Sequence, residues 1–484
     1  MSASPSFRSM FRSSRVRRGF AACAVILAAG GLVLVRAPSQ ARGGGIATSI
    51  TQVAPNGATT ATFTGPGAHG RLSLSHGKLL GGAPRTFYAE LVLSADASEQ
   101  AKERAPLSLA VVLDHSGSMG GETIERAKDA VVELIRELDA DDEIAVVQYD
   151  NESQVVQPLA RVGAVRESLI AKVRAITSGG GTNIPPALAM GLRELEEAGR
   201  GRVRRIVLAS DGLDSTRAQA EEIARTSAQR GVTISSMGIG LDFDEAYMGG
   251  VARAGRGNFA FVKDASALAG FLKREVKEGA TTTIASATAR VALPDGVRFV
   301  RASGADARSL PDGTLELSMG SLFAGDERRV VVELTGDIPV GGVRSLSGAV
   351  TWSRVGGGEA DAKIAALDIG GAADAREVEE ARDGGVLASA VSALASIRQL
   401  EATEAYNRGE GERAQALITQ NENDLRAAAT AAPRAAAEAL DRQLADYGAS
   451  KAAFASAPPA SPAGKAAAKA GAAKDIANMG RRAF

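Results

Sequence analysis

The sequence has very few of the residues that build disulfides, zinc sites and hydrolase active sites. It contains one cysteine, Cys23, so no disulfide can form within the chain. It contains only three histidines, His69, His76 and His115. This scarcity argues against a histidine-rich zinc site and leaves few partners for a catalytic serine.

The chain also lacks an excess of charge of either sign. Its 56 lysines and arginines balance its 56 acidic residues. Proteins that bind nucleic acid over a broad surface usually carry a basic excess. We therefore expect no nucleic acid among the partners of this protein.

The N-terminus predicts export. A basic region without acidic residues is followed by the apolar run 19–35, and residues 39–41 resemble a small-x-small cleavage site. Residues 1–41 are thus expected to be a signal peptide or an N-terminal anchor, and both alternatives stay open. In either case the body is expected outside the cytoplasm, in the periplasm, on the cell surface or secreted. An uncleaved segment would attach it to the inner membrane through residues 19–35.

The length of 484 residues predicts more than one domain. Residues 42–105 show short alternating runs typical of a β region. Residues 106–278 alternate apolar strands with amphipathic helices, which predicts a doubly wound, mostly parallel α/β domain. Residues 279–370 return to strand character and predict an antiparallel β-sandwich. The two β segments are suspected to form one unit with the α/β domain inserted between them; separate β units are the alternative.

The remaining residues are expected to be helical and then disordered. Residues 371–448 have helical periodicity that breaks at Gly409 and Gly411, which predicts a helical hairpin. Residues 449–484 are rich in alanine, proline and lysine, a composition typical of a disordered tail.

Oxygen-bearing side chains follow several of the expected strands. Asp114, Ser116 and Ser118 come directly after the first buried strand of the α/β domain. Thr182 lies in a glycine-rich loop before a helix, and Asp211 ends a later strand. Because open α/β sheets bind ligands beyond the carboxyl ends of their strands, these residues are expected to converge. The set contains no sulfur or nitrogen donor, which favours Mg²⁺, with Mn²⁺ or Ca²⁺ possible, over zinc.

These motifs resemble a known family. "VVLDHSGSM", "GGGTNI" and "RIVLASDG" match, in order and spacing, the von Willebrand factor type A domain with its metal-ion-dependent adhesion site. The resemblance implies that the two serines and the threonine coordinate Mg²⁺ directly, that the aspartates act directly or through water, and that a partner protein supplies an acidic residue. Ser210 stands where many members have threonine. The overall layout loosely resembles secreted bacterial members and the inter-alpha-trypsin inhibitor heavy chains.

Simpler interpretations of the same residues exist. Asp114, Ser116 and Ser118 could form a turn or a helix cap, Thr182 could cap the helix that follows, and Asp211 could belong to an Asp-Gly turn. Other polar residues could line the rim of the site or be ordinary surface residues. These are His115, Glu122, Asp150, Asn183 and Asp214.

The most specific function that this pattern supports is protein–protein interaction or adhesion through the metal and an exposed aspartate or glutamate of the partner. An alternative is a scaffold in which the metal is structural and the C-terminal helices bind the partner. A hydrolase using Ser116 is more remote, because the segment lacks the G-x-S-x-G elbow and the chain has no G-x-x-x-x-G-K-[ST] loop. We therefore expect no enzymatic activity.

Overall fold

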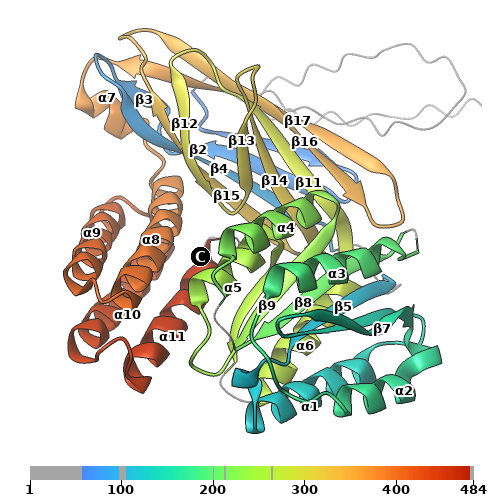
Figure 1. Ribbon diagram of the computed structural model, residues 1–484. Coiled ribbons are helices and arrows are strands. Elements are labelled where there is room, and N and C mark those ends of the chain that lie inside the picture. Colours follow the sequence, from blue (N-terminus) through green and yellow to red (C-terminus); the bar gives the residue numbers. More distant parts are fainter. Residues whose placement is uncertain (1–56, 98–104, 200, 212–213, 263–264, 480–484) are drawn as a thin grey trace, which may run out of the picture. The chain divides into compact units, whose positions relative to one another are not determined.

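A computed structural model (Figure 1) describes five stretches of the chain, which are residues 57–97, 105–199, 201–211, 214–262 and 265–479, without the side chains of 265–269. The predicted signal or anchor at residues 1–41 lies outside these stretches. No helix among the described residues is long and apolar enough to cross a membrane.

The predicted α/β domain is built on a six-stranded sheet with the order β10-β9-β8-β5-β6-β7. All neighbouring strands are parallel except β7, which pairs antiparallel with β6. The strands are β5 (Leu107–Asp114), β6 (Glu143–Tyr149), β7 (Ser153–Arg161), β8 (Val203–Ser210), β9 (Val232–Ile239) and β10 (Arg256–Val262). From β5 the chain adds β6 and β7 on one side of this strand and then β8, β9 and β10 on the other side. The loops that follow the parallel neighbours β5 and β8 therefore lie next to each other at the carboxyl edge of the sheet.

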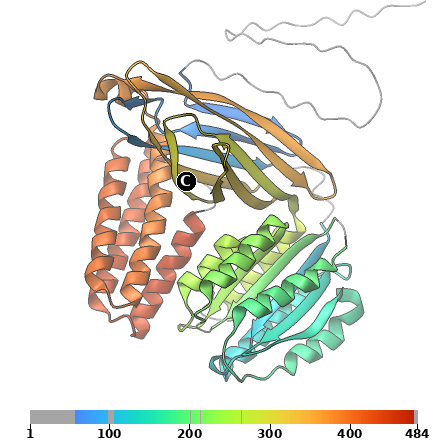
Figure 2. The ribbon, with the colours of Figure 1, turned by 45° about the horizontal axis from the view of Figure 1, so that its top comes forward.

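Helices cover both faces of this sheet (Figures 1 and 2). They are α1 (Glu122–Glu137), α2 (Val162–Arg174), α3 (Ile184–Glu196), α4 (Arg217–Gln229), α5 (Glu245–Ala254) and α6 (Ala265–Ala280). Alternate residues of β5 enter different apolar cores, Val111 with α1, α2 and α6, and Val112 with α3, α4 and α5. All eight residues of β5 are buried, as expected for a strand covered on both faces.

The edge strand β7 was not predicted from the sequence. Ser153–Arg161 contains Pro158, and its residues are mostly only half-buried. Proline is compatible with an edge strand, where no further strand needs its missing N–H group. The weak apolar pattern of an edge therefore concealed this strand.

Two further sheets combine strands from before and after the α/β domain. One has the order β1-β2-β4-β15-β12 and the other β13-β14-β11-β16-β17-β3. The early strands are β1 (Thr60–Gly65), β2 (Ala68–Leu74), β3 (Lys78–Leu80) and β4 (Arg85–Ala95). The late strands are β11 (Thr282–Ala292), β12 (Val297–Ser303), β13 (Asp306–Ser309), β14 (Thr314–Phe323), β15 (Glu327–Gly336), β16 (Val343–Arg354) and β17 (Glu359–Ala372). Because β4 pairs with β15 and β3 with β17, the α/β domain is inserted into one β unit.

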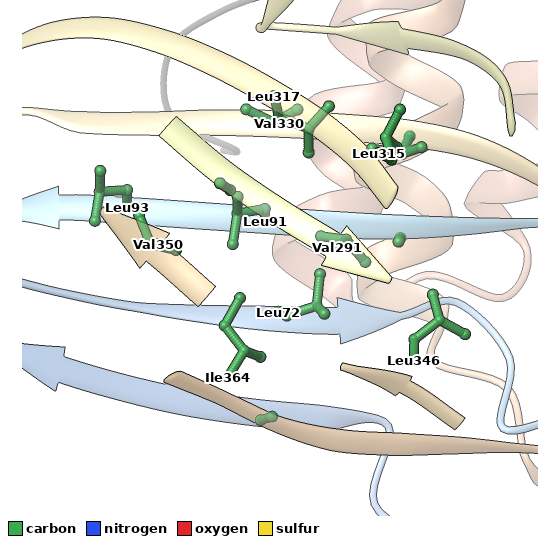
Figure 3. Close-up of a cluster of buried hydrophobic side chains, with 14 of the residues drawn as sticks. Leu72, Leu91, Leu93, Val291, Leu315, Leu317, Val330, Leu346, Val350 and Ile364 are labelled. Carbon is green, nitrogen blue, oxygen red and sulfur yellow. The ribbon is translucent and has the colours of Figure 1, made fainter. Parts of the chain in front are cut away.

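The two sheets enclose a single apolar core. Leu91 and Val330 of one sheet and Val291 and Val350 of the other are among the labelled core residues in Figure 3. Trp352, which is 2% exposed, closes part of this core, and its Nε1 donates to the Pro66 carbonyl oxygen at 3.0 Å. The sandwich is thus held by apolar burial shared between segments far apart in the sequence.

The C-terminal region contains more helix than the sequence predicted. After the short α7 (Ala375–Glu380) come α8 (Gly384–Asn407), α9 (Gly411–Ala429), α10 (Arg434–Ser456) and α11 (Pro462–Asn478). The predicted break at Gly409 and Gly411 separates α8 from α9. Helices α8 and α9 form the predicted hairpin, and α10 and α11 extend it, because both also pack against α8. Alanines and Tyr406, Leu425 and Leu440 form their shared core.

The prediction of a disordered tail at residues 449–484 is wrong for its described part. Helix α10 continues to Ser456, and α11 begins after Ser461, whose Oγ accepts the Gly464 N–H at 3.1 Å. Pro462 occupies the first turn, where its missing N–H has no cost. The alanines that make this segment low in complexity also favour helix and allow close packing, and Ala468 and Ala472 are fully buried.

A buried carboxyl group in α11 makes stability depend on pH. Asp475 is 4% exposed and accepts the Tyr447 hydroxyl at 2.7 Å. Burial raises the pKa of Asp475 to about 7. The unfolded chain releases this proton near pH 4. Between pH 4 and 7 only the folded state holds the proton, so the free energy of unfolding falls as pH rises, and the cost is complete above pH 7.

We therefore expect Asp475→Asn to stabilise the protein at pH 8, by about 2–4 kcal/mol, and to change little at pH 4. Urea unfolding at both pH values measures this. Asp441→Asn, on the surface of α10, is the matched control and should leave the pH slope unchanged. If the free energy of unfolding of Asp475→Asn fell with pH as steeply as that of wild type, Asp475 would not be the group responsible.

Candidate functional site

The site begins where β5 ends. Asp114 is the last residue of the strand and is fully buried. Its Oδ1 accepts the Ser116 N–H at 2.8 Å, and its Oδ2 accepts the Ser210 hydroxyl at 2.6 Å. The Tyr149 hydroxyl lies 3.5 Å from the same Oδ2. The carboxylate is therefore held from its own loop and from both neighbouring strands.

A chain of hydroxyl groups connects this strand end with the end of β8. The Oγ atoms of Ser116 and Ser118 lie 3.1 Å apart, and Ser118 Oγ donates to Asp211 Oδ1 at 2.9 Å. Ser116 is 1% and Asp211 7% exposed. Four of the five predicted site residues are thus linked by hydrogen bonds, as expected for the adjacent carboxyl ends of β5 and β8.

The fifth residue, Thr182, belongs to a loop held against the first. The Gly117 N–H donates to the Gly180 carbonyl oxygen at 3.0 Å, and the Gly179 N–H donates to the His115 carbonyl oxygen at 2.8 Å. Gly180 has a φ of 75°, and a Cβ there would lie 2.3 Å from Asp150 Oδ2. The glycine-rich sequence therefore lets the loop turn tightly and pack beside Asp150.

Helix capping is assigned to a different residue from Thr182. The Ile184 N–H at the start of α3 donates to Asp214 Oδ2 at 2.8 Å, and the adjacent Asn183 makes no side-chain cap. Asp214 also accepts the Thr216 hydroxyl at 2.6 Å. Asp214, and not Thr182, therefore caps the start of α3. Asp214 is thus a structural residue of this loop and not an ordinary surface residue.

The other rim candidates support loops or lie outside the hydrogen-bonded set. His115 Nδ1 contacts the Thr177 carbonyl oxygen at 3.0 Å, which fixes the loop before Thr182. Asp150 accepts the Glu152 N–H at 2.9 Å. Glu122, at the start of α1, is exposed and pairs with Arg126. These contacts give His115 and Asp150 a role in positioning the site.

Ser210 and Tyr149 are site residues that the sequence did not reveal. Ser210 follows the residue that pairs with Leu113, and Tyr149 pairs directly with Asp114. Both therefore flank Asp114 from neighbouring strands. Their positions at strand ends were visible in the sequence, but strand order and register were not, so their contact with Asp114 could not be derived.

The site concentrates negative charge away from water. Burial raises the pKa of Asp114, although hydrogen bonds from Ser116 and Ser210 oppose the rise. Burial also raises the pKa of Asp211 to about 6, and the nearby Asp114 contributes. Within the described residues, neither carboxylate has a lysine or arginine partner at ion-pair distance. Two adjacent buried carboxylates of this kind are stabilised by a cation.

The donor set fits a hard divalent cation. No group of three or more His, Cys, Asp or Glu side chains that could hold a metal occurs in the described parts of the chain. A cation here would therefore be held by two carboxylates together with neutral hydroxyls. Oxygen-only donors suit Mg²⁺ and do not suit zinc.

The fold and these loops agree with a comparison to known families. The model of the von Willebrand factor type A domain matches residues 108–274. Residues 108–274 of this chain are a von Willebrand factor type A domain. The type A domain is thus the inserted α/β domain, and its sheet is the Rossmann-like sheet of that family.

Relatives share sequence with part of this chain. An uncharacterized protein of Synechocystis sp. is 28% identical over 199 residues, 40% of this chain and 47% of that protein. Inter-alpha-trypsin inhibitor heavy chain H4 of Bos taurus is 27% identical over 168 residues, 31% of this chain and 18% of the relative. The chain thus matches less than half the length of these relatives.

A solved structure shows that the likeness in fold includes most of the chain. The von Willebrand factor type A protein from Catenulispora acidiphila has a TM-score of 0.63 and 17% sequence identity, with coverage of 85% of this chain and 97% of that one. At this identity the match shows the fold alone. It supports the arrangement in which the type A domain is accompanied by β and helical parts.

Proposed function

We propose that this protein binds a partner protein through a divalent cation, Mg²⁺ in the first place, held at the carboxyl edge of the type A sheet. The observation that carries the proposal is the hydrogen-bonded series Asp114–Ser116–Ser118–Asp211, which contains two buried carboxylates. The family match to residues 108–274 supports a role in protein interaction.

Each residue has a distinct part in this proposal. Ser116, Ser118 and Thr182 would offer neutral oxygens to the cation, and Asp114 and Asp211 would offer charge directly or through water. A bound Mg²⁺ would supply positive charge and an open position for an aspartate or glutamate of the partner. Because only two protein carboxylates neutralise it, the cation would keep its attraction for a third.

The contacts of Ser116 support a binding role and not catalysis. Its hydroxyl faces Ser118, and the neighbouring His115 imidazole contacts the Thr177 carbonyl oxygen. The His115 Nδ1 atom is therefore turned toward the backbone and not toward the serine hydroxyl. We propose that the protein is not an enzyme, and that it acts outside the cytoplasm, as the basic and apolar residues of segment 1–41 favour.

Capture of partners with and without the cation tests the proposed function. The chain without residues 1–41 is immobilised and exposed to the extracellular and periplasmic proteins of the source cells, in Mg²⁺ or in EDTA. We expect at least one protein to be retained only in Mg²⁺, because its acidic residue completes the coordination of the cation.

Asp114→Asn is the variant that decides between the two modes of binding. Asp114→Asn should lose the Mg²⁺-dependent partner. Asp142→Asn should keep it, because Asp142 contacts the amino end of β5, away from the metal site. Retention of the same proteins by wild type in EDTA and by Asp114→Asn would instead favour the scaffold, in which the C-terminal helices bind the partner.

A further inference from the structure

A small cavity lined by arginines lies at the end of the type A sheet opposite the metal site. Its volume is about 130 Å³, and its walls include Arg253 at the end of α5, Arg256 at the start of β10, Arg274 of α6 and Arg328 of β15. We call it the arginine cavity. Among the described residues that line it, none is acidic. Four basic side chains from four elements therefore surround one hollow.

Arg256 is held in this cavity at a conformational cost. Its φ is 60°, the one positive value outside glycine in the described chain, and residues in this region are strained unless their surroundings enforce it. Its Nε is buried without an acceptor, and its Nη1 lies 3.5 Å from the Arg253 carbonyl oxygen. Burial lowers the pKa of Arg256 to about 10. Asp306 acts on the charge of Arg256, but its Oδ1 also lies 3.4 Å from Arg225 Nε.

Arg253 is the second arginine of the cavity, and Glu221 and Glu404 act on its charge only from beyond ion-pair distance. Within the described part of the chain its guanidinium has neither a hydrogen bond nor an ion pair. Water can reach the side chain, yet the surrounding protein lowers its pKa, mainly by desolvation. The two arginines are three positions apart and line the same hollow, so an anion between them would offset both charges.

The remaining arginines differ in their surroundings. Arg328 lies 3.7 Å from Asp326 and donates to the Ser321 carbonyl oxygen at 3.2 Å. Arg274 is exposed and lies over the Phe271 ring. Arg328 therefore already has partners, and Arg274 contributes at the rim. Apart from Arg274, Arg253 and Arg256 are the arginines of this cavity that have no ion pair among the described residues.

A larger cavity adjoins the first. It has a volume of about 1060 Å³, extends along α5 against α8 and α11, and shares Arg253 and Ile476 with the arginine cavity. Its four other basic groups pair with acids: Arg217 with Glu404 at 3.0 Å, Lys469 with Glu245 at 3.1 Å, Arg408 with Glu410 at 2.7 Å, and Lys465 with Asp242 at 2.5 Å. Arg253 thus lines both cavities. The larger cavity contains acidic partners for its other basic residues, whereas the arginine cavity has no acidic residue in its described lining.

We propose that these two cavities bind a small phosphorylated organic molecule, with its phosphate between Arg253 and Arg256 and its organic body along α5. A phosphate carries nearly two negative charges, which matches two guanidinium groups. Its several oxygens accept the paired N–H groups of more than one arginine, whereas a carboxylate has only two oxygens. The small cavity admits a phosphate group, and the larger one has the size of ordinary ligand sites.

Such a ligand would join three parts of the protein. Arg253 and Arg256 belong to the type A domain, Gly304 and Arg328 to the sandwich, and Ile476 to α11. The ligand would bind independently of the metal, because the site contains none of the residues Asp114, Ser116, Ser118, Thr182 or Asp211.

Calorimetric titration of the purified chain in constant Mg²⁺ tests this proposal with three probes: phenyl phosphate, inorganic phosphate and benzoate. We expect phenyl phosphate to bind most tightly, inorganic phosphate more weakly because it leaves the larger cavity empty, and benzoate weakest. Arg253→Gln should weaken phenyl phosphate binding by at least about tenfold, the loss expected for a hydrogen-bonded charge.

Arg256→Gly separates binding from folding. Glycine adopts the positive φ without strain, so this variant should stay folded by circular dichroism while it loses affinity as Arg253→Gln does. Arg376→Gln on the surface of α7 and Asp114→Asn should both bind phenyl phosphate as wild type does. The proposal is overturned if wild type binds neither phosphate probe, if benzoate binds equally well, or if affinity survives both arginine substitutions.

Discussion

Replacing Asp114 by asparagine is expected to abolish the stabilisation of this protein by Mg²⁺. For wild type, Mg²⁺ at 100 times its dissociation constant should raise the free energy of unfolding by about 2.7 kcal/mol, which thermal unfolding detects as a shift of several degrees. Asparagine keeps the acceptor for the Ser116 N–H but removes one of the two charges that attract the cation. The melting temperature of Asp114→Asn should therefore be the same in Mg²⁺ and in EDTA.

The metal-free proteins provide a second test of the same site. Burial raises the pKa of Asp114, so its ionised form destabilises the metal-free fold at pH 8. In EDTA at that pH, Asp114→Asn should be at least as stable as wild type. Asp142→Asn is the control, because Asp142 is buried at the opposite end of β5, where it accepts the Leu107 N–H at 3.1 Å. It should lose stability but keep the Mg²⁺ shift. A Mg²⁺ shift of wild-type size in Asp114→Asn would contradict the metal assignment.

Replacing Glu275 by alanine should cause the largest loss of stability in the type A domain. Glu275 of α6 is 1% exposed, and its Oε2 accepts Arg205 Nη1 and Ser235 Oγ, each at 2.7 Å. Its Oε1 accepts Asn258 Nδ2 at 2.5 Å. Removing this carboxylate leaves Arg205 charged and buried, with only Glu278 at 3.8 Å. We expect a loss of about 3–5 kcal/mol, measured by urea unfolding.

Two variants distinguish a buried charge from ordinary packing. Replacing both members of the pair, Arg205→Met with Glu275→Leu, should recover much of the loss, because no unpaired charge remains. Lys273→Ala, which removes the partner of Glu137 from the exposed surface of the same helix, should cost less than about 1 kcal/mol. A cost for Glu275→Ala as small as that of Lys273→Ala would show that Arg205 finds water or another acceptor.

The arrangement of β5 and its loop was predictable because its signals are local. A run of apolar residues that ends in Asp114, followed by hydroxyl groups at alternate positions, shows both a buried strand and a polar loop at its carboxyl end. The helices with an apolar face, such as α1, were predictable for the same reason. Edge strand β7 and helix α11 were missed because burial on few sides, or through alanine alone, produces little apolar periodicity.

The sequence by itself determined the residue types at the candidate site, the α/β character of residues 106–278 and the β character on either side. These follow from patterns within short stretches of chain. Only the tertiary structure decided that Ser210 and Tyr149 hold Asp114, that β4 pairs with β15 across the inserted domain, and that Arg253 and Arg256 face a common cavity. Such contacts depend on strand order, register and helix packing, which arise when distant segments bury their apolar surfaces together.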